Sequence, residues 1–137
     1  MKKGLLLAGF VCISLLLTGC QAETKTLNCT MKEDAGGATT TSNMDVTFTG
    51  SKVENINMDI IIDYTDEYAS VSNIFKETLE SQKSTLEETG YEVNITSGDN
   101  FVKLTASGTS ETLTSDESTG SYEKTKESLE NSGYTCK

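Results

Sequence analysis

The sequence contains no histidine, arginine, proline or tryptophan. Lysine is therefore the only cationic side chain, and a nucleophilic serine or cysteine would need a lysine or a carboxylate as its base. No motif of that kind stands out. A zinc site, which needs about four ligands, would have to recruit carboxylates because no imidazole is present. These absences sharply narrow the chemistry that the chain can perform.

Positive charge is scarce as well, because 11 lysines face 21 acidic residues and give a formal net charge of −10. Such a charge repels nucleic acid and acidic lipid headgroups, and it favours cationic partners or simple solubility. The glycine pair at residues 36–37 lacks the following lysine and helix start that would cradle a phosphate, so we interpret it as a turn. We expect no nucleic-acid partner and no cofactor.

Long apolar runs are missing except at the N-terminus. Lys2 and Lys3 precede an apolar run over residues 4–17, and a comfortable membrane span needs more, about 20 residues. A basic start, a short apolar stretch and a small-residue cleavage pattern are typical of a signal peptide rather than an uncleaved anchor. Residues 17–20, LTGC, resemble a lipobox, in which the cysteine thiol takes a diacylglycerol before the chain is cut ahead of it.

This N-terminal pattern predicts where the protein resides. We expect a lipoprotein signal peptide at residues 1–19, a lipidated Cys20 with a short tether at residues 20–26, and a single domain at residues 27–137. Two acyl chains anchor a protein stably, whereas one chain gives only marginal binding. The membrane, reached through the lipid on Cys20, is thus an expected partner. The expected location is the extracytoplasmic side of the cell membrane, lipid-anchored.

Two cysteines remain available for pairing once Cys12 leaves with the signal peptide and Cys20 carries the lipid. Cys29 and Cys136 lie near the two ends of the domain, and a pair outside the reducing cytosol is expected to form a disulfide. In the chain-entropy model, a bridge that closes a loop of about 100 residues destabilises the unfolded state by up to about 4.7 kcal/mol. Free thiols are the alternative.

Hydrophobic periodicity after residue 26 predicts strands and two helices. Alternation of apolar and polar residues indicates strands, and apolar residues three and four apart indicate a helix that stops at a glycine. The expected elements are strands over residues 27–32, 40–49 and 52–64 with a bulge near residues 54–55, a helix over 66–89, a hairpin over 91–106, a polar surface loop over 109–120, a helix over 121–131 capped by Ser121, and a last strand over 134–136. This order predicts an α+β fold, an antiparallel β-sheet of about five to six strands with two helices packed on one face.

Two stretches share a local pattern, LEETGY at residues 86–91 and LENSGY at residues 129–134. Each is expected to end a helix and open a strand. The pattern is consistent with an internal duplication, and equally with the glycine and aromatic residue that such a turn needs in any protein. Both interpretations stay open at this point.

Four stretches carry a resemblance to a known family: the lipobox, LNCT at residues 27–30, FTGSKV at 48–53 and the closing GYTCK at 133–137. Together they resemble small, uncharacterised bacterial lipoproteins of the YehR-like kind. The resemblance covers most of the mature chain. It implies an exported, lipid-anchored α+β domain, and it carries across no catalytic residues.

The sheet face that the helices leave open is the expected binding surface. On the third strand it carries Asn57, Asp59 and Ile61, and its amide and carboxylate groups can hydrogen-bond a polar or cationic partner. We therefore expect a non-enzymatic domain that binds or scaffolds an envelope protein or a polar or cationic ligand. A merely solvated face is the simpler interpretation of the same residues. The rival class is a cell-envelope hydrolase, which needs two Asp or Glu side chains that converge in a concave pocket.

One group of acidic residues is a candidate cation site. Asp63, Asp66 and Glu67 lie close together in the sequence, and calcium prefers several oxygen ligands, but the EF-hand pattern and its central glycine are missing. Acidic residues are favoured at the positive start of a helix. We therefore interpret Asp66 and Glu67 as helix-start residues and predict no metal site.

Lipidation of Cys20 is directly testable. Peptide mass analysis of protein extracted from membranes should find an N-terminal peptide that begins at an acylated Cys20, because the leader ends in a lipobox. The Cys20→Ser variant should lack the acyl mass. Recovery of residues 1–19 still attached to wild-type protein, or of mature protein without lipid, would show that this prediction is wrong.

Overall fold

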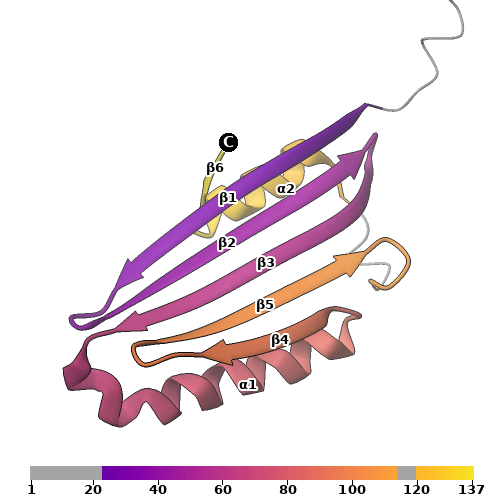
Figure 1. The fold of residues 1–137 in the computed structure, drawn as a ribbon. Helices are drawn as coiled ribbons and strands as arrows, with labels where there is room; N and C mark the ends of the chain where they lie inside the picture. Colours follow the sequence, from indigo (N-terminus) through magenta and orange to yellow (C-terminus); the bar gives the residue numbers. More distant parts are fainter. Residues whose placement is uncertain (1–22, 114–119) are drawn as a thin grey trace, which may run out of the picture.

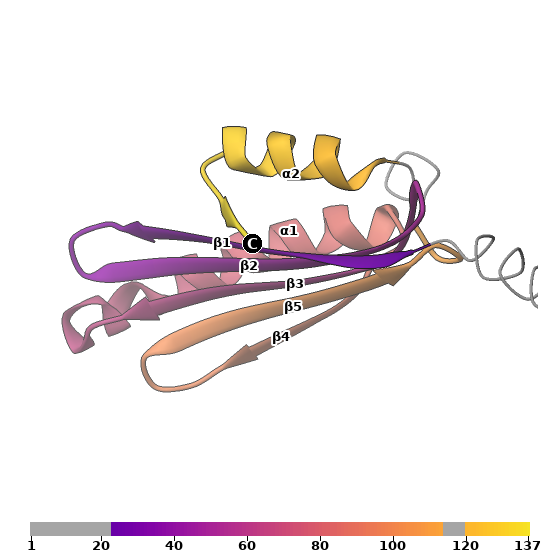
Figure 2. The same cartoon turned by 90° about the horizontal axis from the view of Figure 1, so that it is seen from above.

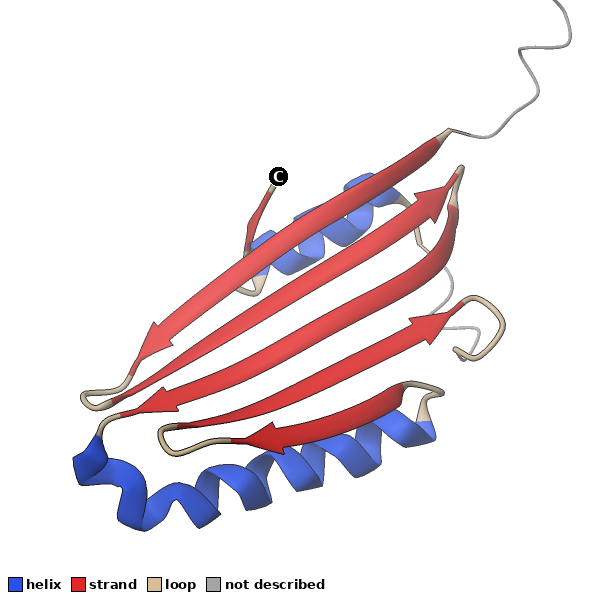
Figure 3. Cartoon of the chain, in the orientation of Figure 1, coloured by secondary structure: helices blue, strands red, loops and turns tan. Residues whose placement is uncertain are grey.

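A six-stranded antiparallel sheet organises the chain, and a computed structural model describes residues 23–113 and 120–137. The strand order is β4-β5-β3-β2-β1-β6, and both α-helices lie on one face (Figures 1 and 2). The elements are β1 (Thr24–Asp34), β2 (Ala38–Thr49), β3 (Lys52–Tyr64), η1 (Asp66–Val71), α1 (Ser72–Glu88), β4 (Glu92–Ser97), β5 (Phe101–Thr109), α2 (Tyr122–Asn131) and β6 (Thr135–Cys136). Figure 3 shows the same order by secondary structure. The predicted α+β architecture is confirmed.

Strands β1, β2 and β3 form a long meander whose alternation divides core from surface. Leu27 pairs with Val46, which in turn pairs with Ile56, and all three are buried under the helices. Thr47 lies opposite Asn55 while the next residue of β2 lies opposite Val53, so β3 contains one extra residue. This irregularity is the bulge predicted near residues 54–55, and it brings Val53 back onto the buried face.

The first strands begin earlier than hydrophobic patterning predicts. β1 starts at Thr24 rather than Leu27, and β2 starts at Ala38. Polar pairing extends them, because the hydroxyls of Thr24 and Thr49 lie 3.5 Å apart and the amide of Gly50 donates to the carbonyl of Glu23 at 3.1 Å. The chain is therefore fixed in the sheet from Glu23 onward. We call this end of the sheet, with Glu23 and the β2–β3 turn, the Glu23 end.

The long helix predicted over residues 66–89 is two elements, and this prediction is corrected. Residues 66–71 form the 3₁₀ turn η1, and α1 begins at Ser72. Ser and Asn compete for the backbone in non-helical conformations, and residues 70–73 read Ser-Val-Ser-Asn. Asn100 also fixes the exit from β3, since its amide donates to Asp66 (2.8 Å) and to the carbonyl of Tyr64 (3.1 Å). α1 is consequently about 26 Å long at about 1.5 Å per residue.

The predicted surface loop over residues 109–120 overlaps the end of β5 by one residue, Thr109. Its one leucine, Leu113, is 7% exposed and packs into the core. Gly108 leaves room for this packing, because a Cβ at that position would meet the Leu113 side chain. One leucine therefore ties the polar segment after β5 to the sheet. Residues 114–119 of the predicted loop lie outside the described part.

Helix α2 follows its sequence prediction closely. It begins after Ser121, whose hydroxyl oxygen accepts from the amide of Lys124 at 3.4 Å. Tyr122 and Leu129 pack against the core, with the Tyr122 ring edge-on to Phe48 at a centroid distance of 5.7 Å. No helix in the described part of the chain combines the length and apolar character that a membrane crossing requires.

Both helices end in the same hydrogen-bonded cap, which accounts for the repeated pattern at residues 86–91 and 129–134. In the first stretch, the tyrosine amide donates to the leucine carbonyl (3.2 Å) and the glycine amide to the glutamate carbonyl (3.1 Å). In the second, the same two bonds measure 3.0 and 3.1 Å. Gly90 and Gly133 have φ of 97° and 100°. This is the Schellman motif, so helix termination alone explains the similarity.

The last strand closes the sheet through the predicted disulfide. Cys29 and Cys136 are directly paired residues of β1 and β6, and their sulfurs form the bridge. Asn28 and Lys137 exchange two backbone hydrogen bonds of 3.2 and 2.9 Å beside it. Because β6 has only two residues, the bridge is the main link that holds α2 over the β1 edge.

Loss of this bridge should destabilise the fold measurably. Cys29→Ala combined with Cys136→Ala should lower the free energy of unfolding by about 2–4 kcal/mol, since the bridge spans 107 residues and constrains the unfolded chain. Urea denaturation of the mature protein measures the change. Reductant should lower wild-type stability similarly and leave the double variant unchanged. An equal urea midpoint for wild-type protein with and without reductant contradicts the prediction.

Candidate functional site

The residues predicted as sites lie in three separate places. Cys20 lies outside the described residues. Cys29 and Cys136 form the disulfide at the β1 edge. Asn57 and Ile61 lie with Asp59 along β3 on the face without helices, which faces the viewer in Figure 1.

Polar cross-strand pairs cover this open face. The hydroxyls of Thr26 and Thr47 lie 3.4 Å apart, and Thr30 donates to the Asn43 side chain at 3.0 Å. Lys103 lies 3.8 Å from the carboxylate of Asp59. These groups thus bond largely with one another across neighbouring strands, in the manner of a solvated sheet surface. A binding role for Asn57, Asp59 and Ile61 stays a prediction.

Two carboxylates line a shallow hollow of about 400 Å³ at the end of the sheet opposite Glu23. Thr39 of β2 pairs with Asp34 on one side and Asp63 on the other. The Cα atoms of the two acidic residues are therefore two strand spacings apart, which is about 9–10 Å. The hydroxyl of Thr39 donates to Asp34 at 2.6 Å. Both carboxylates are exposed. This hollow contains the pair of acidic side chains that the hydrolase hypothesis requires.

The described residues give no support to a cation site near the 3₁₀ turn. Among residues 23–113 and 120–137, no three Cys, Asp or Glu side chains are grouped closely enough to hold a metal ion. Asp66 instead accepts the hydrogen bond from Asn100, and it stands with Glu67 in the first turn of η1. Both residues thus occupy the start of a helical turn, as predicted.

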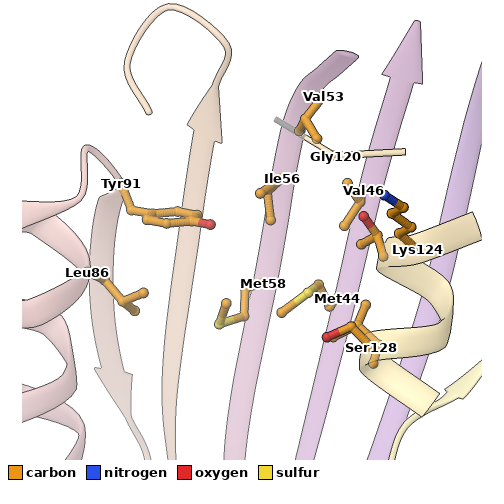
Figure 4. Close-up of a pocket in the computed structure, with 12 residues that line it drawn as sticks. Met44, Val46, Val53, Ile56, Met58, Leu86, Tyr91, Gly120, Lys124 and Ser128 are labelled. Atoms are coloured by element: carbon orange, nitrogen blue, oxygen red, sulfur yellow. The ribbon is translucent and has the colours of Figure 1, made fainter. Parts of the chain in front are cut away.

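A groove of about 550 Å³ lies on the other face of the sheet, between the two helices. Figure 4 shows Leu86 and Tyr91 on the α1 side and Lys124 and Ser128 on the α2 side, with the strand side chains between them. The lining residues are Met44, Val46, Val53, Ile56, Met58, Leu86, Tyr91, Gly120, Lys124, Thr125, Ser128 and Leu129. Ligand sites commonly measure about 300–1,000 Å³ and combine apolar walls with a few polar groups. The groove fits that description.

The groove exists because the helices lie over opposite edges of the sheet. α1 contacts β4 and β5, whereas α2 contacts β1 and β6, and Figure 1 shows α1 along the β4 side of the sheet and α2 behind β1. The two helix axes are separated by three to four strand spacings of about 4.8 Å each, so they are roughly 15–20 Å apart. Packed helices approach to about 8–10 Å. Helical cover of β2 and β3 is therefore incomplete between the helices, where Met44 and Met58 stay half-buried while Val46 and Ile56 beside them are buried.

Two methionines form the middle of the groove floor. Met44 of β2 and Met58 of β3 are directly paired, and both are half-buried rather than buried. A thioether side chain is flexible and polarisable, and methionine is over-used at binding surfaces that accept varied ligands. The floor can therefore adjust to the shape of an apolar occupant.

A second hollow of about 270 Å³ continues the groove along α1. It shares Met58 and Leu86 with the first and adds Ile60 to the floor and Gln82 to the wall. The combined floor follows β3 from Val53 to Ile60, which is roughly 20 Å at about 3.3 Å per residue. The site is thus an elongated trough rather than a round pocket.

The groove was not among the predicted sites. Alternation correctly placed Met44 and Met58 on the helix-covered face, but it predicted them as core. The number of predicted elements could have indicated the groove. A sheet of six strands is about 24 Å wide at about 4.8 Å per strand, whereas two helices about 10 Å in diameter cover about 20 Å of it. Helices that do not lie side by side therefore leave a gap between them.

Comparisons with known proteins bear on the fold. No protein-family model matches the sequence, and no curated protein matches it either. Among solved structures, the chain is similar to the NMR structure of a protein from Streptococcus pneumoniae TIGR4, with a TM-score of 0.50 and 11% sequence identity. The match covers 84% of this chain and 86% of that one. At this identity the similarity establishes a shared fold.

Proposed function

We propose that the protein is a lipid-anchored, non-enzymatic binding domain on the extracytoplasmic side of the cell membrane, and that it holds an amphipathic ligand in the groove between α1 and α2. The observation that carries this proposal is the half-buried Met44–Met58 pair under a trough of about 550 Å³. Apolar surface left open in this way is worth about 25 cal/mol for each Å² that a ligand covers.

The side chains of the groove support binding in a defined orientation. Its floor is apolar, while Lys124, Thr125 and Ser128 place one ammonium and two hydroxyl groups along the α2 wall. An apolar ligand with a polar end would satisfy both surfaces at once. A few polar groups in an apolar site typically fix the orientation of a ligand.

The membrane location is supported by the leader and by the short distance between it and the fold. The LTGC stretch ends at Cys20, and the chain is already hydrogen-bonded in the sheet at Glu23. Three residues span at most about 10 Å, so a lipid on Cys20 would hold the Glu23 end against the bilayer. Membership of the YehR-like family, suggested by the same termini, belongs to this proposal.

A second candidate function is the carboxylate-dependent envelope hydrolase. Its supporting observation is the Asp34 and Asp63 pair in the hollow opposite the Glu23 end. Glycoside hydrolysis uses a pair of carboxyl groups that flank the scissile bond. Release of fragments from purified cell wall, lost on Asp63→Asn, would favour this function over the binding domain.

Filling the groove should abolish ligand binding. The substitution Met58→Trp places an indole on the groove floor, and it should weaken the affinity for a fluorescent fatty-acid analogue at least tenfold. Asn57→Trp is the matched control, because the adjacent side chain lies on the opposite face of β3. Titration of residues 23–137, which contain every described element, measures both dissociation constants.

The same pair of variants separates the two surfaces. Unchanged affinity for Asn57→Trp with loss for Met58→Trp supports the groove. The reverse result would assign binding to the open sheet face and contradict the proposal. Circular dichroism of each variant checks that a loss does not come from unfolding.

A further inference from the structure

We infer that the occupant of the groove is one acyl chain of an anionic membrane amphiphile, whose charged head lies beside Lys124. This inference rests on the proposed function and names the ligand class for the same site. Four features of the structure carry it: the position of the groove relative to the Glu23 end, its length, its width and its charge.

One end of the groove lies at the end of the sheet that the chain reaches first. Val53 and Gly120 line it there, and Val53 follows the β2–β3 turn whose Gly50 is hydrogen-bonded to Glu23 at 3.1 Å. Because Cys20 precedes Glu23 by three residues, a lipid on Cys20 would hold this end of the sheet within about 10 Å of the bilayer surface. A lipid in that bilayer is therefore the amphiphile at highest local concentration.

The length of the trough suits a lipid tail. Its floor from Val53 to Ile60 extends roughly 20 Å at about 3.3 Å per residue. One leaflet of a bilayer contributes half of a hydrocarbon core of about 30 Å, so an acyl chain is about 15 Å long. A single tail therefore fits along β3 with its end near the second hollow, which includes Ile60 and Gln82.

The width of the trough favours an alkyl chain over a helical peptide. Helices with side chains are about 10–12 Å across, so axes roughly 15–20 Å apart leave about 3–10 Å between their surfaces. Apolar carbons contact at about 4 Å. An extended alkyl chain fits this gap, whereas another helix would force α1 and α2 apart.

The charge of the groove selects the head of the ligand. Lys124 is the charged side chain of the lining, and within the described part of the chain it forms no ion pair. The mature chain, with nine lysines against 21 acidic residues, repels anions at long range, acidic lipid headgroups included. Dissolved salt screens that repulsion at distances beyond about 8–10 Å. A lipid delivered by the membrane anchor meets mainly the local field of Lys124.

The methionines of the native chain provide a direct test. Cells that express the full chain are grown with a diazirine analogue of methionine and irradiated, and the adducts at each methionine are identified by mass spectrometry. The inference predicts phospholipid or other anionic lipid adducts at Met44 and Met58, at least fivefold above those at Met31. Met31 is the internal control, because it lies beside Gly133, away from the groove.

Lysine variants test the head contact. Lys124→Gln should lower the share of anionic lipids among the adducts at Met58 at least threefold, while Lys126→Gln, on the same helix but outside the lining, should leave it unchanged. An equal fall in the share of anionic lipids in both variants would show that Lys124 does not bind the head, and it would contradict the inference of an anionic head.

The other outcomes are distinguishable. Peptide adducts at Met44 and Met58 would overturn the lipid occupant and leave the proposed binding function standing with a protein ligand. Equal lipid adducts at all three methionines would show unspecific contact with the bilayer and overturn the inference. Water adducts alone at Met44 and Met58 would overturn both the inference and the proposed function.

Discussion

The site depends on a mismatch between the width of the sheet and the cover that its helices provide. Leu79 of α1 is fully buried against the β4–β5 side, and Tyr122 of α2 packs on Phe48 toward the other side. Each helix therefore maximises its own contact at one edge. Between the helices, Met44, Met58 and Ile60 of the middle strands stay half-buried, and incompletely covered apolar surface commonly marks a binding site.

Covalent and backbone constraints keep the helices at those edges. The Cys29–Cys136 bridge holds the chain after α2 to β1, and the Schellman caps direct each chain back into the sheet immediately after its helix. Gly90 is tightly constrained, because a Cβ there would collide with the backbone carbonyl of Thr112. The lining that the described residues provide is consequently held by these fixed elements, which favours a preorganised ligand site.

Sequence patterning predicted the α+β fold, the disulfide, the bulge near residues 54–55 and the capping Ser121, because each depends on short-range periodicity or on a unique residue pair. It failed where polar contacts determine the structure. Thr24 extends β1 through its pairing with Thr49, and Asn100, in the turn between β4 and β5, fixes the 3₁₀ turn through its hydrogen bond to Asp66. Patterning also assigned Met44 and Met58 to the core. Periodicity reports which face a residue lies on, but not whether another element covers it.

The central claim is that Met44 and Met58 lie in an open ligand site while Met31 does not. Methyl NMR of the mature protein labelled at the methionine methyl groups, titrated with a short-chain alkyl phosphate below its micelle concentration, tests this most directly. The account predicts saturable shifts of the Met44 and Met58 signals with one shared dissociation constant and a static Met31 signal. Unshifted signals from Met44 and Met58 at saturating ligand, or equal shifts at all three methionines, would contradict it.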